Sequence, residues 1–373
     1  MGQDRTVPGA FVNPALATVL LVLLAAVLLT LPLLPALREL RIKRDAAPLV
    51  VIQQYAGEIR HFAHGFRHHI EGLLGPLQQC IALGTTATGT LGPSDEYVLL
   101  GRNDNASLIR AGKMNGSTCS LMVAIGPDMA LPGGLTFLKE VYAAGILVGG
   151  EGVTYRAVLG ERDIHLERAS KVMRWAHAVG RFRADHDCDL YGRVSSDQEI
   201  MLQSGCMFQR LNAPCIAMPC ASATLDDAVS PAAGASNNRQ IPERPLSRKL
   251  IVDDFEIRSG EVITGNIVTR GKLRIGAGAR VLGSVKSNKE MVVEAGVAVE
   301  GSLISAATMH IGPGCEIHGP VIAERGMVIE SGTQCGSAQT PTTVSSPIID
   351  VEEGSLFFGT LWARDEGRVV PRG

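Results

Sequence analysis

The sequence predicts a mainly β fold, a β-solenoid (β-helix) whose coils are 18 residues long and form two repeat blocks. One observation is a glycine at every eighteenth position of the C-terminal half, at Gly265, Gly283, Gly301 and Gly319. A second is an apolar series with the same step, Leu273, Met291, Met309 and Met327. The composition agrees, because 42 glycines and only 4% aromatic residues favour short strands and tight turns over a helical core.

The same period occurs upstream and places a first block at residues 146–213, with the second at residues 250–366. One upstream series is Ile146, Ile164, Phe182 and Ile200, and the other is Arg156, Arg174, Gly192 and Arg210. Two independent series with one period indicate stacked coils rather than chance. The glycine positions of the second block predict corners where the backbone is left-handed or approaches the next coil closely.

Side chains alternate within each coil, as the stretch "MHIGPGCEIHGPVIAE" shows. Its odd positions, such as Met309 and Ile311, are apolar or small, whereas polar residues such as His310 and Glu316 take even positions. Because 18 is even, this parity is preserved from coil to coil. Period-two burial that keeps its parity is what a β-solenoid requires.

An N-terminal segment predicts a transmembrane helix at residues 11–37, since it is uncharged and long enough for a span. Four basic residues follow it at once: Arg38, Arg41, Lys43 and Arg44. The positive-inside rule therefore predicts a single-pass protein of a bacterial inner membrane, with its N-terminus outside and its main body cytoplasmic.

Residues 45–81 predict a juxtamembrane amphipathic helix, because apolar residues recur at steps of three and four. Its polar side carries His61, His64 and His68 at helical spacing. Metal binding by this trio is the less favoured interpretation, since no carboxylate ligand has matching spacing. Residues 82–145 predict an irregular lead-in with short strands, and residues 214–249 a flexible insert or linker.

The second block resembles the bactofilins, bacterial polymer-forming cytoskeletal proteins. The likeness is carried by "VITGNIVTRGKLRIGAGARVLGSVKSNKEMVVEAGVAVEGSLISAATMHIGPGCEIHGPVIAERGMVIESG", which covers about a quarter of the chain with its flanks. The resemblance implies a right-handed β-helix of three short strands per coil, no bound nucleotide or metal, and filaments formed end to end. This chain differs in its predicted membrane helix, its upstream block, and the arginines at Arg156, Arg174 and Arg210.

A hexapeptide-type acyltransferase is an alternative, because an aliphatic residue recurs every six positions on two of the three faces. The third face departs from that template at Ser287, Ser305 and Ala323. His310 and His318 are predicted to point outward, and no inserted loop shapes a pocket beside them. The eight cysteines include no CxxC pair and predict buried free thiols. We therefore predict no enzyme and no catalytic, metal or cofactor site.

The predicted function is a membrane-anchored, non-enzymatic scaffold that self-associates or docks partners in a bactofilin-like cytoskeletal or envelope-organising role. We expect an open C-terminal end with an assembly interface at Phe357, Phe358 and Trp362. An arginine strip at Arg156, Arg174 and Arg210 is a candidate anion-facing surface. Expected partners are the protein itself, membrane lipid and envelope-synthesis proteins; the net charge of −2 does not suggest nucleic acid. A binding module for an envelope-synthesis partner or anionic polymer is a further alternative.

Overall fold

The computed structural model describes residues 14–34, 60–92, 95–102, 114–220 and 247–372. The chain divides into two compact units, one formed by residues 1–53 with 242–245 and the other by the remaining residues. The described part of the first unit is helix α1 (Pro14–Thr30) and the 3₁₀ turn η1 (Leu31–Leu33). Predicted elements at residues 35–59, including the basic run Arg38–Arg44, and most of the predicted linker at 214–249 lie outside the described residues.

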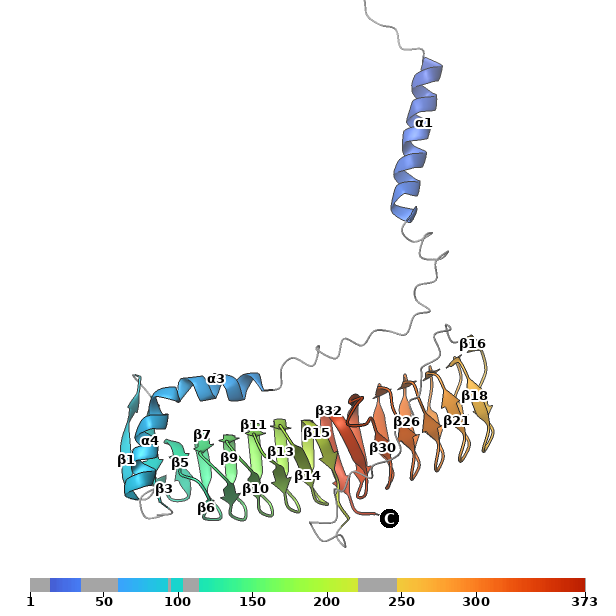
Figure 1. Ribbon diagram of the computed structural model, residues 1–373. Coiled ribbons are helices and arrows are strands. Elements are labelled where there is room, and N and C mark those ends of the chain that lie inside the picture. Colours follow the sequence, from blue (N-terminus) through green and yellow to red (C-terminus); the bar gives the residue numbers. More distant parts are fainter. Residues whose placement is uncertain (1–13, 35–59, 93–94, 103–113, 221–246, 373) are drawn as a thin grey trace, which may run out of the picture. The chain divides into compact units, whose positions relative to one another are not determined.

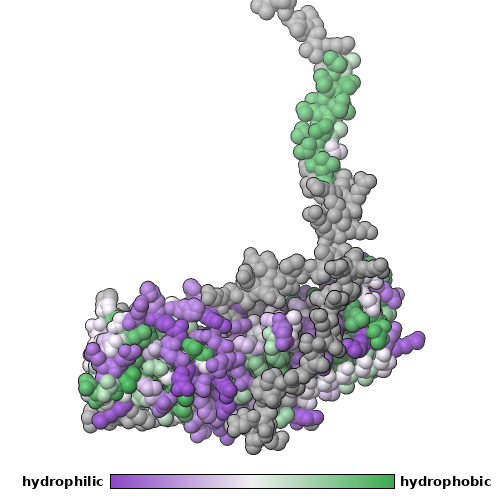
Figure 2. All heavy atoms as spheres, in the orientation of Figure 1, coloured by the Kyte–Doolittle hydropathy of each residue, from purple (hydrophilic) through white to green (hydrophobic). Residues whose placement is uncertain are grey.

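Helix α1 is uncharged, and Figure 2 shows hydrophobic side chains along it. Leu21 and Leu29 are 67% and 72% exposed. The helix has 17 residues, and residues 11–13 and 35–37 of the predicted span lie outside the described residues. In the described part of the chain, no helix combines the length and apolar character needed to cross a membrane.

The second unit opens with helices α3 (His61–His69) and α4 (Glu71–Leu83), which account for the described part of the predicted amphipathic helix. Phe66, Leu73 and Leu77 are buried, in keeping with the predicted apolar stripe. Gly84 caps the C-terminus of helix α4 with a left-handed φ of 60°. A residue with a side chain would be strained in this backbone conformation. The helix pair therefore presents one face to the β structure.

The first block winds from β1 to β15. Its strands are β1 (Thr86–Leu91), β2 (Asp95–Leu100), β3 (Met114–Asn115), β4 (Thr118–Cys119), β5 (Met122–Ile125), β6 (Met129–Leu131), β7 (Thr136–Ala143), β8 (Leu147–Gly149), β9 (Thr154–Gly160), β10 (Ile164–Leu166), β11 (Lys171–Ala178), β12 (Phe182–Ala184), β13 (Asp189–Ser196), β14 (Glu199–Leu202) and β15 (Met207–Ala217). Strand β1 pairs antiparallel with β2, and parallel stacking begins where β2 pairs with β5. Regular coils thus start within residues 82–145, where the sequence predicted an irregular lead-in.

The second block winds from β16 to β32 in shorter strands. They are β16 (Arg248–Ile251), β17 (Phe255–Ile257), β18 (Val262–Thr264), β19 (Asn266–Thr269), β20 (Leu273–Ile275), β21 (Arg280–Leu282), β22 (Val285–Ser287), β23 (Met291–Val293), β24 (Ala298–Val299), β25 (Leu303–Ser305), β26 (Thr308–Ile311), β27 (Glu316–Ile317), β28 (Val321–Ala323), β29 (Gly326–Ile329), β30 (Gln334–Cys335), β31 (Thr342–Glu352) and β32 (Leu356–Val370). Leu273, Met291, Met309 and Met327 are successive partners in parallel register. The predicted 18-residue coil and its inward parity are confirmed, since all four are buried.

Serines that break the hexapeptide pattern are buried at an inner corner of the second block. Ser287 Oγ donates a hydrogen bond to the carbonyl of Gly271 at 2.8 Å, and Ser305 Oγ donates one to Lys289 at 2.8 Å. Both acceptors belong to the preceding coil, so each hydroxyl satisfies a backbone carbonyl where the chain turns between faces. The corner is therefore polar without leaving these buried hydroxyls unpaired.

The first block keeps the 18-residue step less strictly. Ile164, Phe182 and Ile200 are register partners as predicted, but the upstream partner of Ile164 is Leu147, not Ile146. Register shifts between Val172 and Trp175 and between Leu190 and Arg193 interrupt the second predicted series. An extra residue at such a bulge bends the strand into the next face and moves the following side chains by one place.

The two blocks form one stack in which the C-terminal strands meet (Figure 1). Strand β15 pairs antiparallel with β32, and β32 also pairs in parallel with β31. The prediction of an open C-terminal end is wrong, because both edges of β32 are used within the chain. Phe357 is 1% exposed and lies opposite Ile216, and Trp362 lies opposite Arg210. The second block thus runs back toward the first and closes on it.

The predicted glycine series marks a corner where adjacent coils approach closely. A Cβ added at Gly301 would lie 2.5 Å from the carbonyl carbon of Gly283, and one at Gly319 equally close to Gly301. Of the four glycines, only Gly265 has a positive φ, at 126°. Close approach, rather than left-handed backbone, therefore explains the repeat of this residue.

We expect Gly301→Ala to destabilise the protein by roughly 2 kcal/mol or more, because the new methyl group must displace backbone of the neighbouring coil. Gly326→Ala is the matched control, since its added Cβ would meet only Thr308 Cγ2 at 3.9 Å. Urea unfolding of both variants measures the difference. Equal midpoints for the two variants would contradict the close-approach explanation.

Candidate functional site

Helix α3 packs on the outside of the first block over a second apolar cluster. Outward side chains of the strands, such as Ala157 and Trp175, are buried beneath it. Phe66 meets Trp175 edge to face, with ring centroids 5.7 Å apart, and Phe62 stacks on the Arg193 guanidinium at 5.1 Å. The helix therefore covers a strip of the solenoid surface by aromatic contact.

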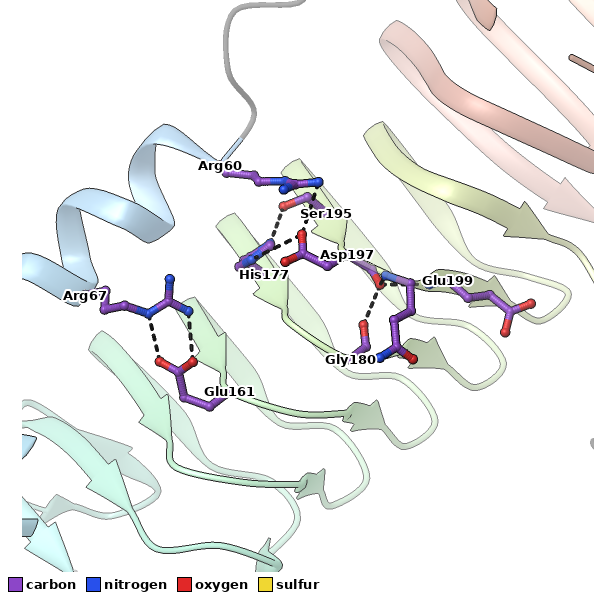
Figure 3. Close-up of polar contacts among 10 residues, drawn as sticks. Arg60, Arg67, Glu161, His177, Gly180, Ser195, Asp197 and Glu199 are labelled. Atoms are coloured by element: carbon purple, nitrogen blue, oxygen red, sulfur yellow. Dashed lines mark hydrogen bonds and ion pairs between the residues drawn. The ribbon is translucent and has the colours of Figure 1, made fainter. Parts of the chain in front are cut away.

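Two ion pairs hold α3 to the coils (Figure 3). Arg67 donates to both oxygens of Glu161 at 2.9 Å, and Arg60 lies 3.1 Å from Asp197. The hydrogen bond to Glu161 raises the pKa of Arg67, with burial opposing it. Burial, followed by the charge of Glu161, raises the pKa of Tyr142 to about 12. Because Arg67 binds both carboxylate oxygens of Glu161, this bidentate ion pair fixes the orientation of the helix as well as its position.

A buried imidazole lies beside these pairs. His177 is 2% exposed, and its Nδ1 lies 2.9 Å from Ser195 Oγ while its Nε2 lies 3.9 Å from Asp197. The three residue types are those of a hydrolase triad, but Ser195 is 1% exposed, so a substrate carbonyl has no room beside its oxygen. The geometry suits a neutral histidine that ties two adjacent coils together under the helix.

Burial lowers the pKa of His177 to about 4, with Arg60, Arg67 and His64 acting in the same direction and Asp197 opposing them. The unfolded chain therefore binds this proton more readily than the folded one, so stability is lost as the pH falls from about 6.5 toward 4. The loss is at most about 3 kcal/mol.

We expect His177→Gln to flatten the pH dependence of unfolding between pH 7 and 4, because the amide keeps a polar contact but does not titrate. Urea unfolding of both proteins at a series of pH values gives the difference that belongs to this residue. Parallel curves for the two proteins would contradict the assignment.

A different kind of site is the first coil of the second block, residues 248–264, named here the open-end coil. In the described part of the chain, β16, β17 and β18 each pair along one edge only, with β19, β20 and β21. Leu250, Val252 and Val262 are 59%, 63% and 61% exposed on this coil. Among the described residues, the coil thus combines a strand edge that pairs with no other strand and exposed apolar side chains.

The opposite end of the stack is different in character. Strand β1, with sequence "TATGTL", exposes its threonines and turns back antiparallel on β2. Helix α4 buries Leu73 and Leu77 in the same apolar cluster as Leu99 of β2. The two ends therefore offer unequal surfaces for association.

The predicted arginine strip does not form a single row. Arg156 hydrogen-bonds the Leu138 carbonyl at 3.2 Å and pairs with Glu140 at 3.5 Å, and Arg174 lies exposed at the bulge. The register partner of Arg210 is Arg193 rather than the predicted Gly192. The Arg210 guanidinium carbon lies 5.0 Å from the centroid of the Trp362 ring. Bulges that sequence spacing does not reveal separate the three residues.

Three of the predicted histidines lie at exposed or half-buried positions near carboxylates. His68 lies 3.3 Å from Glu71, His310 lies 2.7 Å from Glu330, and His318 lies 3.7 Å from Glu300. Among the described residues, no group of three or more His, Cys, Asp or Glu side chains is placed to hold a metal ion.

All eight cysteines are free, and six of them are buried: Cys80 on the buried face of helix α4, and Cys119, Cys188, Cys206, Cys315 and Cys335 in the solenoid core. Burial raises the pKa of Cys335 to about 12, which keeps it as a thiol.

Sequence reasoning missed both the open-end coil and the junction of the blocks. A signal for the first was present, because Val252 and Val262 are apolar at even positions, where the next coil carries Arg270 and Arg280. No comparable signal marked β15 and β32 as partners, since antiparallel pairing across about 150 residues leaves no period in the sequence.

The chain matches no model of a known protein family, no curated protein and no solved structure. The fold established here is a β-solenoid with coils of about 18 residues, which is compatible with a structural scaffold.

Proposed function

We propose that this protein is a membrane-anchored, non-enzymatic scaffold, bactofilin-like in its second block, that pairs with a second copy through the open-end coil. The observation that carries the proposal is that β16, β17 and β18 have one edge without a partner strand in the described part of the chain, beside the exposed side chains of Leu250, Val252 and Val262. Unpaired strand edges with apolar neighbours associate unless they are covered.

The junction inside the chain supports this mode of pairing. At β15 and β32 two stacks of coils meet at equivalent ends, and their strands pair antiparallel. Two solenoids of one handedness always run in opposite directions where such ends meet. Two copies joined at their open-end coils by a two-fold axis would therefore pair β16 with β16 in the same manner.

The properties of the two ends of the stack also determine whether the protein can form a filament or only a dimer. A filament needs two adhesive ends, whereas the β1 end presents threonines and a returning hairpin. We therefore expect a closed pair of scaffolds rather than a long polymer.

We expect Val252→Lys with Val262→Lys to convert the dimer to monomer, because two lysines on each copy would place four like charges at the interface. Sedimentation of the full-length protein in detergent measures the mass. Val292→Lys with Val328→Lys is the matched control, since both valines are 39% exposed in mid-stack. A monomeric wild type, or equal effects of the two pairs, would refute pairing through this end.

The N-terminal segment would hold the scaffold at a bacterial inner membrane with its solenoid in the cytoplasm. The support is the uncharged stretch at residues 11–37, the four basic residues that follow, and exposed leucines on α1. Membrane lipid is then the partner of the anchor, and envelope-synthesis proteins are candidate clients of the scaffold.

We expect Leu21→Arg with Leu24→Arg to release the protein from membranes, because each arginine costs about 2.5–3.5 kcal/mol at the centre of a span. Alkaline extraction of membranes followed by detection of the protein measures release. Leu83→Arg is the control, since Leu83 is 75% exposed on α4. Wild-type protein in the soluble fraction would count against an anchor.

A further inference from the structure

One row of outward side chains runs along the stack on the face that α3 partly covers. Strand pairing connects its members in the order Ala157, Trp175, Arg193, Arg210, Trp362, Ser345, Ile322, Ile304, Lys286, Val268 and Leu250. We call this set the axial row. It crosses the junction of the two blocks without interruption.

Helix α3 shows how a helix fits this row. Phe66 contacts Trp175, and Phe62, one helical turn earlier, contacts Arg193 on the next coil. Coils repeat about every 4.8 Å and a helix rises about 1.5 Å per residue, so one side chain in every three or four meets each coil. The row is therefore a track that a helix with ordinary apolar spacing can follow.

The part of the axial row beyond Arg193 is mostly apolar, and its side chains are exposed or half-buried. Trp362, Ile322 and Leu250 are 38%, 36% and 59% exposed, whereas Trp175 beneath α3 is 7% exposed. The neighbouring outward row of the second block is mainly charged: Glu256, Arg274, Val292, His310, Val328, Asp350 and Arg368. The exposed apolar strip thus continues the face already used by α3.

Two arginines lie where the part of the row beyond α3 begins. Arg193 and Arg210 are register partners on adjacent coils, so their like charges lie close together. Within the described residues, the Arg210 Nε atom is buried and has no hydrogen-bond partner. A buried guanidinium nitrogen of this kind needs an acceptor, and a carboxylate supplies one together with the opposite charge.

We propose that the axial row from Arg210 to Leu250 binds an amphipathic helix of a partner protein. Seven steps between coils give a track of about 34 Å, the length of about 22 helical residues. The partner helix carries an apolar residue at every third or fourth position and a glutamate or aspartate that reaches Arg210. Lys286 further along the row favours a second acidic residue.

A partner helix fits better than a second copy or a lipid surface. The α3 helix of a second copy is occupied on its own first block by Arg67–Glu161 and Phe66–Trp175. A bilayer would need a broad apolar face, whereas this strip is one side chain wide and borders a charged row. Two observations point to a helix with acidic residues: continuity with the α3 contact, and the Nε–H donor of Arg210, which has no acceptor among the described residues.

The test uses a fluorescent 22-residue synthetic helix with leucines at three- and four-residue steps and one flanking glutamate, titrated with the full-length protein. We expect Ile304→Glu with Ile322→Glu to weaken binding at least tenfold, because two carboxylates would enter the apolar track. Val292→Glu with Val328→Glu, on the neighbouring row, should change affinity less than twofold. These sites lie in mid-stack, so failure here leaves pairing through the open-end coil untouched.

The acidic contact is tested with Arg210→Gln and with a peptide in which glutamine replaces the glutamate. Each change alone should weaken binding, and the two together should be no worse than one, since they remove the same pair. No binding of the peptide, equal effects of the two glutamate pairs, or additive effects of the Arg210 and peptide changes would overturn the proposal. Loss of binding to anionic lipid vesicles in Ile304→Glu with Ile322→Glu, without loss of peptide binding, would also overturn it in favour of a lipid surface.

Discussion

The structure depends on one constraint, the need of every coil to pair the backbone along both of its edges. A coil in mid-stack satisfies this through its two neighbours, as Met309 does with Met291 and Met327. The difficulty is confined to the ends of each block, where a row of amides and carbonyls has no neighbour in sequence. Two blocks would have four such ends. The pairing of β15 with β32 removes two of them at once, and the antiparallel β1 closes part of a third. Among the described residues, the open-end coil remains, so the site proposed for association follows from the way the blocks are joined.

Features set by local spacing could be predicted from the sequence, because each coil repeats the same environment. The inward series through Met309, the outward histidines and the close-approach glycines all follow from period and parity. The first block was predicted less well, since bulges near Trp175 and Arg193 change the step without changing the composition. Glycine- and threonine-rich coils before residue 146 were predicted as irregular because few large apolar residues reveal their alternation. The order of the blocks in space could not be predicted from the sequence, since it depends on the contact of Phe357 with the first block rather than on any repeat.

The outer surface obeys a second constraint that acts through charge. Outward positions on a solenoid form ladders at the coil spacing, so like residues at one position become close neighbours. Acids and bases alternate between neighbouring coils at some outward positions, as in the pairing of Arg274 with Glu256 and of Lys272 with Glu290. The axial row departs from this, because it holds apolar residues and only positive charges. Where α3 covers the row, aromatic rings of the helix lie on its Trp175 and Arg193, and acids on flanking positions meet the basic residues of the helix.

The inverted order of the blocks connects these two surfaces. If the second block continued the winding of the first, its last coil would be a free end and its first would be buried at the junction. Instead Phe357 is buried at the junction and Leu250 lies exposed on the open-end coil. The axial row continues from one block to the other along one face of the stack. The two stacks have one handedness and meet with antiparallel strands. The face of the first block that carries the axial row therefore continues directly into the corresponding face of the second block. A helix track begun under α3 therefore leads along the second block to the open-end coil, and Leu250 belongs to both surfaces. The proposed association at the end and the proposed docking along the side would therefore be coupled, since a second copy bound at the open-end coil would limit how far a partner helix extends along the row.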